Sequence, residues 1–180
     1  MKLPPELEFH DDLHLLIYRP HGVIDEEVVK KVVDVLENLE AKLQKPFNRF
    51  FDTLGADEVE LNFKYVIQVS LCRRLSYTGH PPVKSAILAA DATMIHYARL
   101  HALLTQGSPI HVRVFKDRKE AADWLAVPLE RLTTDRRTKQ AADKIHRYGS
   151  NGANPAVVFC CWLDFPGCPE LIHDFWYLAL

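Results

Sequence analysis

Residues 110–127 constrain the fold of this chain more than any other segment. They open with six residues of strand composition, Ile-His-Val-Arg-Val-Phe, pass through a charged turn, and close on Trp124 and Leu125. Asp117 precedes the second part, and an aspartate accepts hydrogen bonds from the free N–H groups of a helix's first turn. The segment therefore predicts a buried strand, a capped turn and a helix over 118–126, with Trp124 and Leu125 docked on a sheet.

The same order of strand and helix recurs earlier in the chain. Apolar residues at helical spacing follow a capping residue at three places, which predicts helices over 25–44, 62–77 and 92–106. Residues 52–57 are expected to form a loop. Strands are predicted on both sides of His10-Asp11-Asp12 within residues 6–24, and over 47–52, 83–90 and 110–115. Strands that alternate with helices predict a mostly parallel sheet with crossover helices.

Residues 83–90, Val-Lys-Ser-Ala-Ile-Leu-Ala-Ala, form a nearly continuous apolar run of strand length. Such a run is typical of an interior strand that is covered on both faces, because an exposed edge of this composition would invite aggregation. The second helix is predicted to bury one face. That face comprises Phe63, Val66, Ile67, Ser70, Leu71 and Leu75.

The composition narrows the range of partners and compartments. The formal net charge is −2 and the pI is about 6.5, so a nucleic-acid partner is not expected. The N-terminal residues lack the apolar core of a signal peptide, and no apolar run approaches the roughly 18 residues of a transmembrane segment. Of four cysteines, only Cys72 lies in the body of the chain, which favours a reduced, cytoplasmic protein.

The character of the chain changes after Pro128. Residues 132–149 are polar and basic, whereas residues 157–180 are rich in aromatic and cysteine side chains. We therefore predict one domain over residues 1–132 and an irregular C-terminal extension over 133–180. Three roles for the aromatic end stay open: packing on the domain, contact with a partner subunit in a homo-oligomer, or poor order.

Several of these features together define a family pattern. They are the stretch His21-Gly22-Val23-Ile24 before a helix, a strand that ends in Phe51-Asp52, the apolar Ala86-Ile87-Leu88, and the loose signature Phe-x-x-x-x-Glu-Ala-x-x-Trp-Leu that begins at Phe115. In this order they resemble the SpoIIAA-like family, also described as STAS-like or Sec14-like domains. The resemblance implies an α/β fold with a four- to five-stranded, mostly parallel sheet packed with helices. It also implies a regulatory binding module, and relatives in the wider grouping bind lipids or other small apolar ligands.

One function of the family depends on residues that can be checked in this sequence. Anti-sigma-factor antagonists carry a phosphorylated serine in a segment Asp-x-Ser-Gly that is followed by Asp-Ser-Ser-Gly at the next helix start. Here Asp52-Thr53-Leu54-Gly55 can stand for the first half, but Glu60-Leu61-Asn62-Phe63 occupies the second. Asn62 can cap a helix but cannot take a phosphate, so the usual phosphoserine switch is not expected. Thr53 is the nearest hydroxyl, and a structural role in its loop is favoured over a phosphosite.

The carboxyl end of the third predicted strand is the candidate site, because ligands of open α/β sheets bind at strand carboxyl ends. Acidic residues cluster there: Asp52, Asp57, Glu58 and Glu60. They can do acid–base work or hold a cation, although a solvated acidic loop is the commoner meaning. Aromatic residues surround the same loop: Phe47, Phe50, Phe51, Phe63 and Tyr65. If some of them face a cleft, they would line an apolar pocket, and the candidate ligand-binding residues are then Phe51, Asp52, Thr53 and Phe63.

Other reactive residues favour structural interpretations. His96 and His101 are five residues apart, so the metal-binding His-x-x-x-His spacing is absent. A sulfur-rich cluster comprises Cys160, Cys161, Cys168 and His173. Adjacent cysteines chelate zinc poorly, so neither a metal nor another cofactor is expected. Cys72 is expected to be a buried structural thiol, and the pair Arg73-Arg74 to be a solvated helix end rather than an anion site.

The sequence therefore leads to two hypotheses on function. The first is a non-enzymatic regulatory module that works through contact with a protein partner. The alternative is a carrier or sensor of a small apolar ligand such as a lipid. An enzyme is not expected, because the sequence contains no Gly-x-Ser-x-Gly, no glycine-rich phosphate loop and no nucleophile with an identifiable base.

Overall fold

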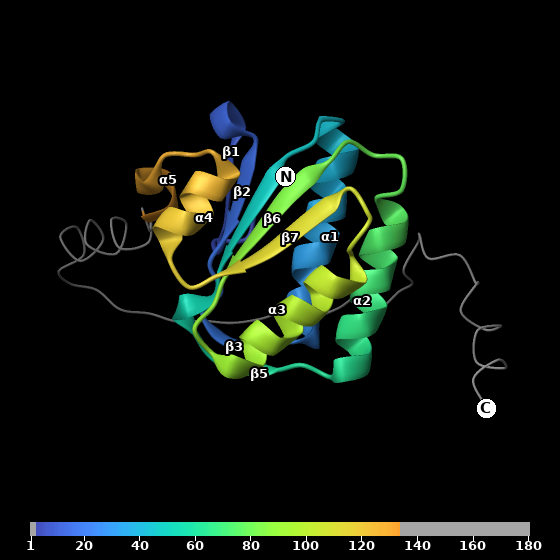
Figure 1. The fold of residues 1–180 in the computed structure, drawn as a ribbon, viewed down its shortest axis with the longest axis vertical. Coiled ribbons are helices and arrows are strands. Elements are labelled where there is room, and N and C mark those ends of the chain that lie inside the picture. The colour runs from blue at the N-terminus through green and yellow to red at the C-terminus, as the bar shows by residue number, and fades with distance from the viewer. Residues whose placement is uncertain (1–2, 134–180) are drawn as a thin grey trace, which may run out of the picture. The chain divides into compact units, whose positions relative to one another are not determined.

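A computed structural model of the chain describes residues 3–133 and places a five-stranded sheet at its centre (Figure 1). The strands, in spatial order, are β1 (Leu7–His10), β2 (Leu15–Tyr18), β4 (Asn48–Asp52), β6 (Val83–Leu88) and β7 (Ile110–Phe115). β1 is antiparallel to β2, and the other neighbours are parallel. The prediction of an α/β fold with a mostly parallel sheet is confirmed.

A second, two-stranded sheet was not predicted. It pairs β3 (Gly22–Asp25) with β5 (Ala56–Glu60) in parallel. The expectation that residues 52–57 form only a loop was wrong, because a single 3-10 turn, Thr53–Gly55, leads directly into β5. The sequence of β5 is mostly acidic and does not alternate between apolar and polar residues as a strand with one buried face does. It therefore resembles the sequence of a loop.

Helices cover both faces of the five-stranded sheet (Figure 1). On one face lie α1 (Glu26–Leu43), α2 (Phe63–Ser76) and α3 (Ala92–Leu104), and on the other lie α4 (Arg118–Leu125) and α5 (Leu129–Thr133). The four predicted capping residues are confirmed, since each side chain accepts a hydrogen bond from the first turn of its helix. They are Asp25, Asn62, Asp91 and Asp117.

The register of the parallel strands decides which side chains meet on each face. Arg49 of β4 pairs with Ser85 of β6, and two residues further on Phe51 pairs with Ile87. Successive side chains of a strand point to opposite faces, so these four share one face, which is the face under α1, α2 and α3. The opposite face carries the apolar residues that pack against α4 and α5. They are Leu15, Ile17, Phe50, Ala86 and Leu88.

β6 is an interior strand, as predicted from its apolar run. It is hydrogen-bonded to β4 on one side and to β7 on the other. Ala86 and Leu88 have no exposed surface at all. Burial on both faces and pairing on both edges explain why all residues of this strand except Lys84 and Ser85 are apolar.

The predicted buried face of α2 was wrong in part. Val66, Ser70 and Arg73 are the residues that α2 buries, whereas Phe63 and Leu75 are exposed, Leu75 by 72%. The buried positions are spaced by four and three residues, as a helix face requires, but two of the three are polar. The buried face of this helix is mostly polar. The positions of its apolar residues therefore predicted the wrong face.

The closing helix α4 docks mainly through Leu125, which is buried among residues from both layers. Trp124 packs against the same cluster but is only partly buried, with its ring 5.5 Å from that of Phe115. The cationic groups of Lys84 and Arg113 both lie 5.4 Å from the centre of the indole. Trp124 therefore lies at the edge of the core, whereas Leu125 is the residue of this pair that is buried in it.

We predict that Leu125→Ala lowers the free energy of unfolding by about 2–5 kcal/mol, because the substitution leaves a cavity beneath α4. Leu103→Ala is the control: Leu103 is 65% exposed, so the change should stay within about 0.5 kcal/mol. Urea unfolding of the two variants and the wild type measures both values. Equal losses in the two variants would contradict the position of Leu125 in the core.

The last described helix, α5, completes the core of the domain. Leu132 is fully buried in the cluster beneath α4, and the guanidinium of Arg19 donates to its carbonyl oxygen at 3.1 Å. The extension predicted over 133–180 lies outside the described residues, apart from Thr133. The same holds for Cys160, Cys161, Cys168 and His173 and for the aromatic residues near the C-terminus.

We predict that a chain shortened to residues 1–133 folds by itself. The argument is that α5, with Leu132 in the core, ends at Thr133, so the sheet and its helices are complete at that point. Calorimetry should show a cooperative transition within a few degrees of that of the full chain. Precipitation or a broad, non-cooperative transition would show that residues after 133 are part of the core.

Candidate functional site

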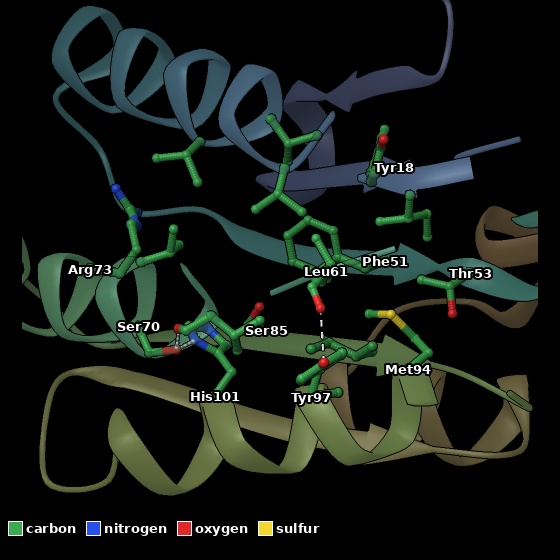
Figure 2. A pocket seen from close by; sticks show the side chains of 18 of the residues that line it. Tyr18, Phe51, Thr53, Leu61, Ser70, Arg73, Ser85, Met94, Tyr97 and His101 are labelled. Carbon is green, nitrogen blue, oxygen red and sulfur yellow. Dashed lines mark hydrogen bonds between the residues drawn. The ribbon is translucent and has the colours of Figure 1, made fainter. Parts of the chain in front are cut away.

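A cavity of about 160 Å³ lies between the five-stranded sheet and the layer of α1, α2 and α3 (Figure 2). It is partly open to solvent. Residues from the sheet, from all three helices and from the turn before α2 line it. Its lining includes Tyr18, Val33, Arg49, Phe51, Thr53, Leu61, Ser70, Arg73, Ser85, Ile87, Met94, Tyr97 and His101.

The walls of the cavity are mostly apolar. α1 contributes a stripe of valines and one leucine at helical spacing, and the sheet contributes Phe51 and Ile87 as part of the floor. Tyr18 stands beside Phe51 with the two rings edge to face. Burial, together with the negative charges of Glu6 and Asp25, raises the pKa of Tyr18 to about 12, so this phenol is neutral at physiological pH. The walls can therefore hold hydrocarbon and offer little to a polar ligand.

One end of the cavity is polar, and its charges meet at a single carboxylate. The guanidinium groups of Arg49 and Arg73 both donate to Oε1 of Glu40 on α1, Arg73 at 2.8 Å. The hydroxyl of Tyr77 accepts a hydrogen bond from Arg49 at 2.6 Å and donates to the same Glu40 oxygen at 3.1 Å. Arg49 is 2% exposed and Arg73 is 4% exposed, so two cations are held inside the protein.

The buried cations are not fully balanced by their partners. Glu37 is the other carboxylate near Arg73, but its oxygen is 3.5 Å away and its side chain is 46% exposed. Burial lowers the pKa of the Arg49 guanidinium, and the charge of Arg73 lowers it further, against the opposing effects of Tyr77 and Glu40. The Nε atom of Arg49 is buried and has no hydrogen-bond partner in the described residues. A buried donor without an acceptor is costly, so this end of the cavity has unmet capacity for a negative group.

Ser70 and His101 lie at the same end of the cavity as Arg73, as Figure 2 shows. Ser70 Oγ donates its one proton to the carbonyl of Val66 at 2.6 Å and lies 2.9 Å from Nδ1 of His101. Because the serine proton is already used, Nδ1 carries the hydrogen of the imidazole and donates it to Ser70. Desolvation lowers the pKa of His101 to about 4, and the charges of Arg73 and Arg49 act in the same direction. His101 is therefore neutral at pH 7.

This serine–histidine pair lacks the arrangement of an activated nucleophile. A general base must accept the serine proton, whereas here Nδ1 faces Ser70 as a donor. A pKa of about 4 also makes the imidazole a weak base. The pair connects α2 to α3 and gives the cavity a neutral polar wall beside the two cations.

Of the four ligand-binding residues predicted from the sequence, two line the cavity and two do not. Phe51 and Thr53 line the cavity. Asp52 points to the other face of the sheet, where it is buried and forms an ion pair with Arg118 at 2.7 Å. Phe63, at the start of α2, is 49% exposed and is not a lining residue. Phe51 and Asp52 are adjacent in a strand, so the alternation of side chains keeps them on opposite faces.

The hydroxyl near the family's phosphorylation segment is engaged in the structure. Thr53 Oγ1 donates to the carbonyl of Leu88 at 2.8 Å, which ties the turn after β4 to the end of β6. Asn62 accepts a hydrogen bond from the backbone of Lys64 and caps α2. The favoured structural role of Thr53 agrees with these contacts, although the backbone group it bonds belongs to the neighbouring strand.

The residues at the polar end were missed or misjudged from the sequence. Arg73 was expected at a solvated helix end and is instead buried. Arg49 lies within a strand whose other central residues are aromatic, and a cation in such a segment is the signal that could have indicated a buried charge. Cys72, expected to be buried, is only partly so. Nothing in the sequence indicates that His101 and Ser70 are neighbours, because their proximity depends on how α2 packs against α3.

Two further findings concern residues 3–133. No three histidine, cysteine or acidic side chains in this part of the chain are grouped so that they could hold a metal ion. None of its helices combines the length and the apolar character needed to cross a membrane.

The acidic residues after β4 do not gather into one cluster, because Asp52 faces α4 whereas Asp57, Glu58 and Glu60 belong to β5.

No protein-family model and no curated protein matches the chain. A solved structure from Shewanella loihica is similar to it, an uncharacterized protein of the DUF3478 family described as having a SpoIIAA-like fold. The two sequences are 20% identical, and the match covers 66% of this chain and 90% of the other, with a TM-score of 0.45. The fold named in that description is the one that the sequence resembles, and the likeness concerns the fold alone.

The depressed pKa of His101 predicts a specific loss of stability in acid. An unfolded chain would bind a proton near pH 6.5, whereas the folded chain resists protonation until about pH 4. The contribution of His101 is therefore fully present above pH 6.5 and falls by up to about 3 kcal/mol as the pH drops to 4. Urea unfolding at several pH values should show a smaller loss for His101→Gln than for the wild type.

His96→Gln serves as the control on the same helix, because His96 is exposed and should keep the wild-type pH dependence. Parallel curves for His101→Gln and the wild type would mean that the imidazole is not desolvated in the folded protein.

Proposed function

We propose that this protein is a non-enzymatic binding module that holds a small apolar ligand between its sheet and helices α1–α3. The observation that supports the proposal is the cavity of about 160 Å³ with apolar walls and a few polar groups at one end. Ligand sites in proteins generally combine these two properties, since hydrocarbon contacts supply affinity and a few polar groups fix orientation. The proposal follows the second of the two hypotheses drawn from the sequence.

The size of the cavity narrows the class of ligand. A cavity of about 150 Å³ lined by apolar side chains binds benzene, whereas pockets for drug-sized ligands occupy roughly 300–1,000 Å³. The ligand proposed here is therefore small, with a ring or a short hydrocarbon chain. A whole two-chain lipid would not fit inside, which restricts the lipid carrier considered from the sequence to a carrier of a small amphiphile.

The shape of the cavity supports a ligand that lies along the sheet. Arg73, Ser70 and His101 are at one end, and Thr53 and Met94 are at the other (Figure 2). Tyr97 stands between the two ends, where its hydroxyl donates to the carbonyl of Leu61 at 2.8 Å. That bond satisfies the phenol, so the middle of the cavity presents its ring and not its hydroxyl.

The regulatory module with a protein partner remains the second candidate. It is supported by the exposed leucines of α2, Leu71 and Leu75, which lie one helical turn apart on the surface. If a partner binds this helix, the double variant Leu71→Glu, Leu75→Glu should lose it in a cross-linking experiment in cells and keep ligand binding. Size-exclusion chromatography of the same variant also tests the homo-oligomer considered from the sequence.

Ligand binding can be tested with a neutral probe of suitable size. We predict that hexan-1-ol binds to the wild type and raises its melting temperature, because the chain fills the cavity and binding to the folded state alone stabilises it. Val33→Phe should weaken this binding at least about tenfold by placing a ring where the ligand lies. Isothermal titration calorimetry measures both affinities.

Leu103→Phe, on the exposed surface of α3, is the matched control and should bind the alcohol as the wild type does. Equal binding of hexan-1-ol by Val33→Phe and the wild type, or absence of binding by hexan-1-ol and by charged amphiphiles of the same chain length, would contradict the proposed ligand site.

A further inference from the structure

We propose that the ligand of this cavity is an anionic amphiphile, a small carboxylate whose head group lies against Arg49 and Arg73 and whose hydrocarbon chain lies between the sheet and α1. The inference rests on the proposed function and adds the chemical class of the ligand. It is carried by the polar end of the cavity, where two buried guanidinium groups share one oxygen of Glu40.

The first step concerns charge. Glu40 Oε1 is the carboxylate oxygen closest to both guanidinium groups, and Glu37, the second carboxylate, lies 3.5 Å from Arg73 with 46% of its side chain exposed. The positive charge at this end is therefore balanced only in part inside the protein, and incompletely paired buried charge is costly. A ligand with one negative charge would improve the pairing, a neutral ligand would leave it as it is, and a cationic ligand would worsen it.

The second step concerns hydrogen bonds. Arg49 has five N–H donors, and its hydrogen bonds to Glu40 and Tyr77 both come from Nη2. Its Nε is buried without a partner in the described residues, and Arg49 lines the cavity. The free Nε–H can donate one hydrogen bond to a carboxylate oxygen, and such a charge-assisted bond is stronger than one to a neutral acceptor.

The third step concerns the surroundings of the head group. Tyr77 contacts both cations through its ring, whose centre lies 5.0 Å from the guanidinium carbon of Arg49 and 5.2 Å from that of Arg73. These contacts keep the two groups in place before any ligand arrives. His101 and Ser70, which are hydrogen-bonded to each other at 2.9 Å, add no further charge beside them. Ordered donors in a site of low polarity bind a charged group more strongly than the same donors in water.

The fourth step concerns the rest of the ligand. Along β4, Arg49 is followed two residues later by Phe51, so the polar layer of the floor gives way at once to an apolar layer. A molecule that fits both layers has an anionic head and an apolar body, and a volume of about 160 Å³ suits a body with one ring or a short chain. A short-chain or aromatic carboxylate meets these requirements.

The experiment compares three probes of the same chain length at pH 7, namely hexanoate, hexan-1-ol and hexylamine. Isothermal titration calorimetry with the full chain should show hexanoate binding at least about tenfold more tightly than the alcohol, and the amine more weakly than both. Equal binding of hexanoate and hexan-1-ol would overturn the inference and leave the proposed function intact. Absence of binding by all three probes would overturn both.

Arg49→Met tests the head-group site directly. The variant should bind hexan-1-ol within about threefold of the wild type but lose the preference for hexanoate. Arg113→Met, which removes an exposed arginine of β7 outside the cavity, is the matched control and should keep the preference. A preference for hexanoate that persists in Arg49→Met would overturn the assignment.

A measurement on the wild type covers the case in which Arg49→Met does not fold. Hexanoate labelled with carbon-13 at the carboxyl group reports its own protonation by NMR. When bound, it should stay ionised at lower pH than in water, because the two guanidinium groups favour the charged form. A bound carboxyl group that titrates as in water, or at higher pH, would show that the head group lies away from the arginines.

Discussion

The carboxylate of Glu40 connects α1, β4 and α2 at a single point. It accepts hydrogen bonds from Arg49 of β4, from Arg73 of α2 and from Tyr77 just after α2, while Glu40 itself belongs to α1. Burying such charges is costly, and a buried ion pair is weak evidence for stability. The hydrogen bonds to Glu40 instead fix the positions of α1 and α2 at one end of the sheet. The cavity lies beside this junction.

The two faces of the sheet consequently differ in character. Under α4 and α5 most buried side chains are apolar, with Phe50 and Leu88 fully buried, and the buried carboxylate of Asp52 is paired with Arg118. Under α1, α2 and α3 the floor begins with Arg49 and Ser85 and becomes apolar only from Phe51 and Ile87 onward. One face therefore serves as the core, and the other combines packing with a cavity that has a polar end. This asymmetry is the physical basis for assigning a ligand to one side of the sheet.

Much of the fold could be predicted from local patterns. The caps of α1 and α4, the interior position of β6 and the mostly parallel order follow from residues close together in the sequence, such as Asp25, Asp117 and the apolar run from Val83. Predictions failed where local patterns were weak. β5 is acidic and has no fully buried residue, so its sequence does not show the apolar pattern of a strand. α2 buries Ser70 and Arg73 because these side chains form hydrogen bonds with His101 on α3 and Glu40 on α1.

The candidate site was predicted only in part for the same reason. The sequence by itself determined the order of strands and helices, the caps and the apolar strands, because these depend on neighbours within a few residues and on the alternation of side chains. It also placed Phe51 and Thr53 near a strand end. Only the tertiary structure decided that Asp52 pairs with Arg118 on the other face of the sheet, and that Arg49, Arg73 and His101 meet. Arg49 and Arg73 are 24 positions apart, and hydrogen bonds to Glu40 exist only once α1, β4 and α2 have packed together.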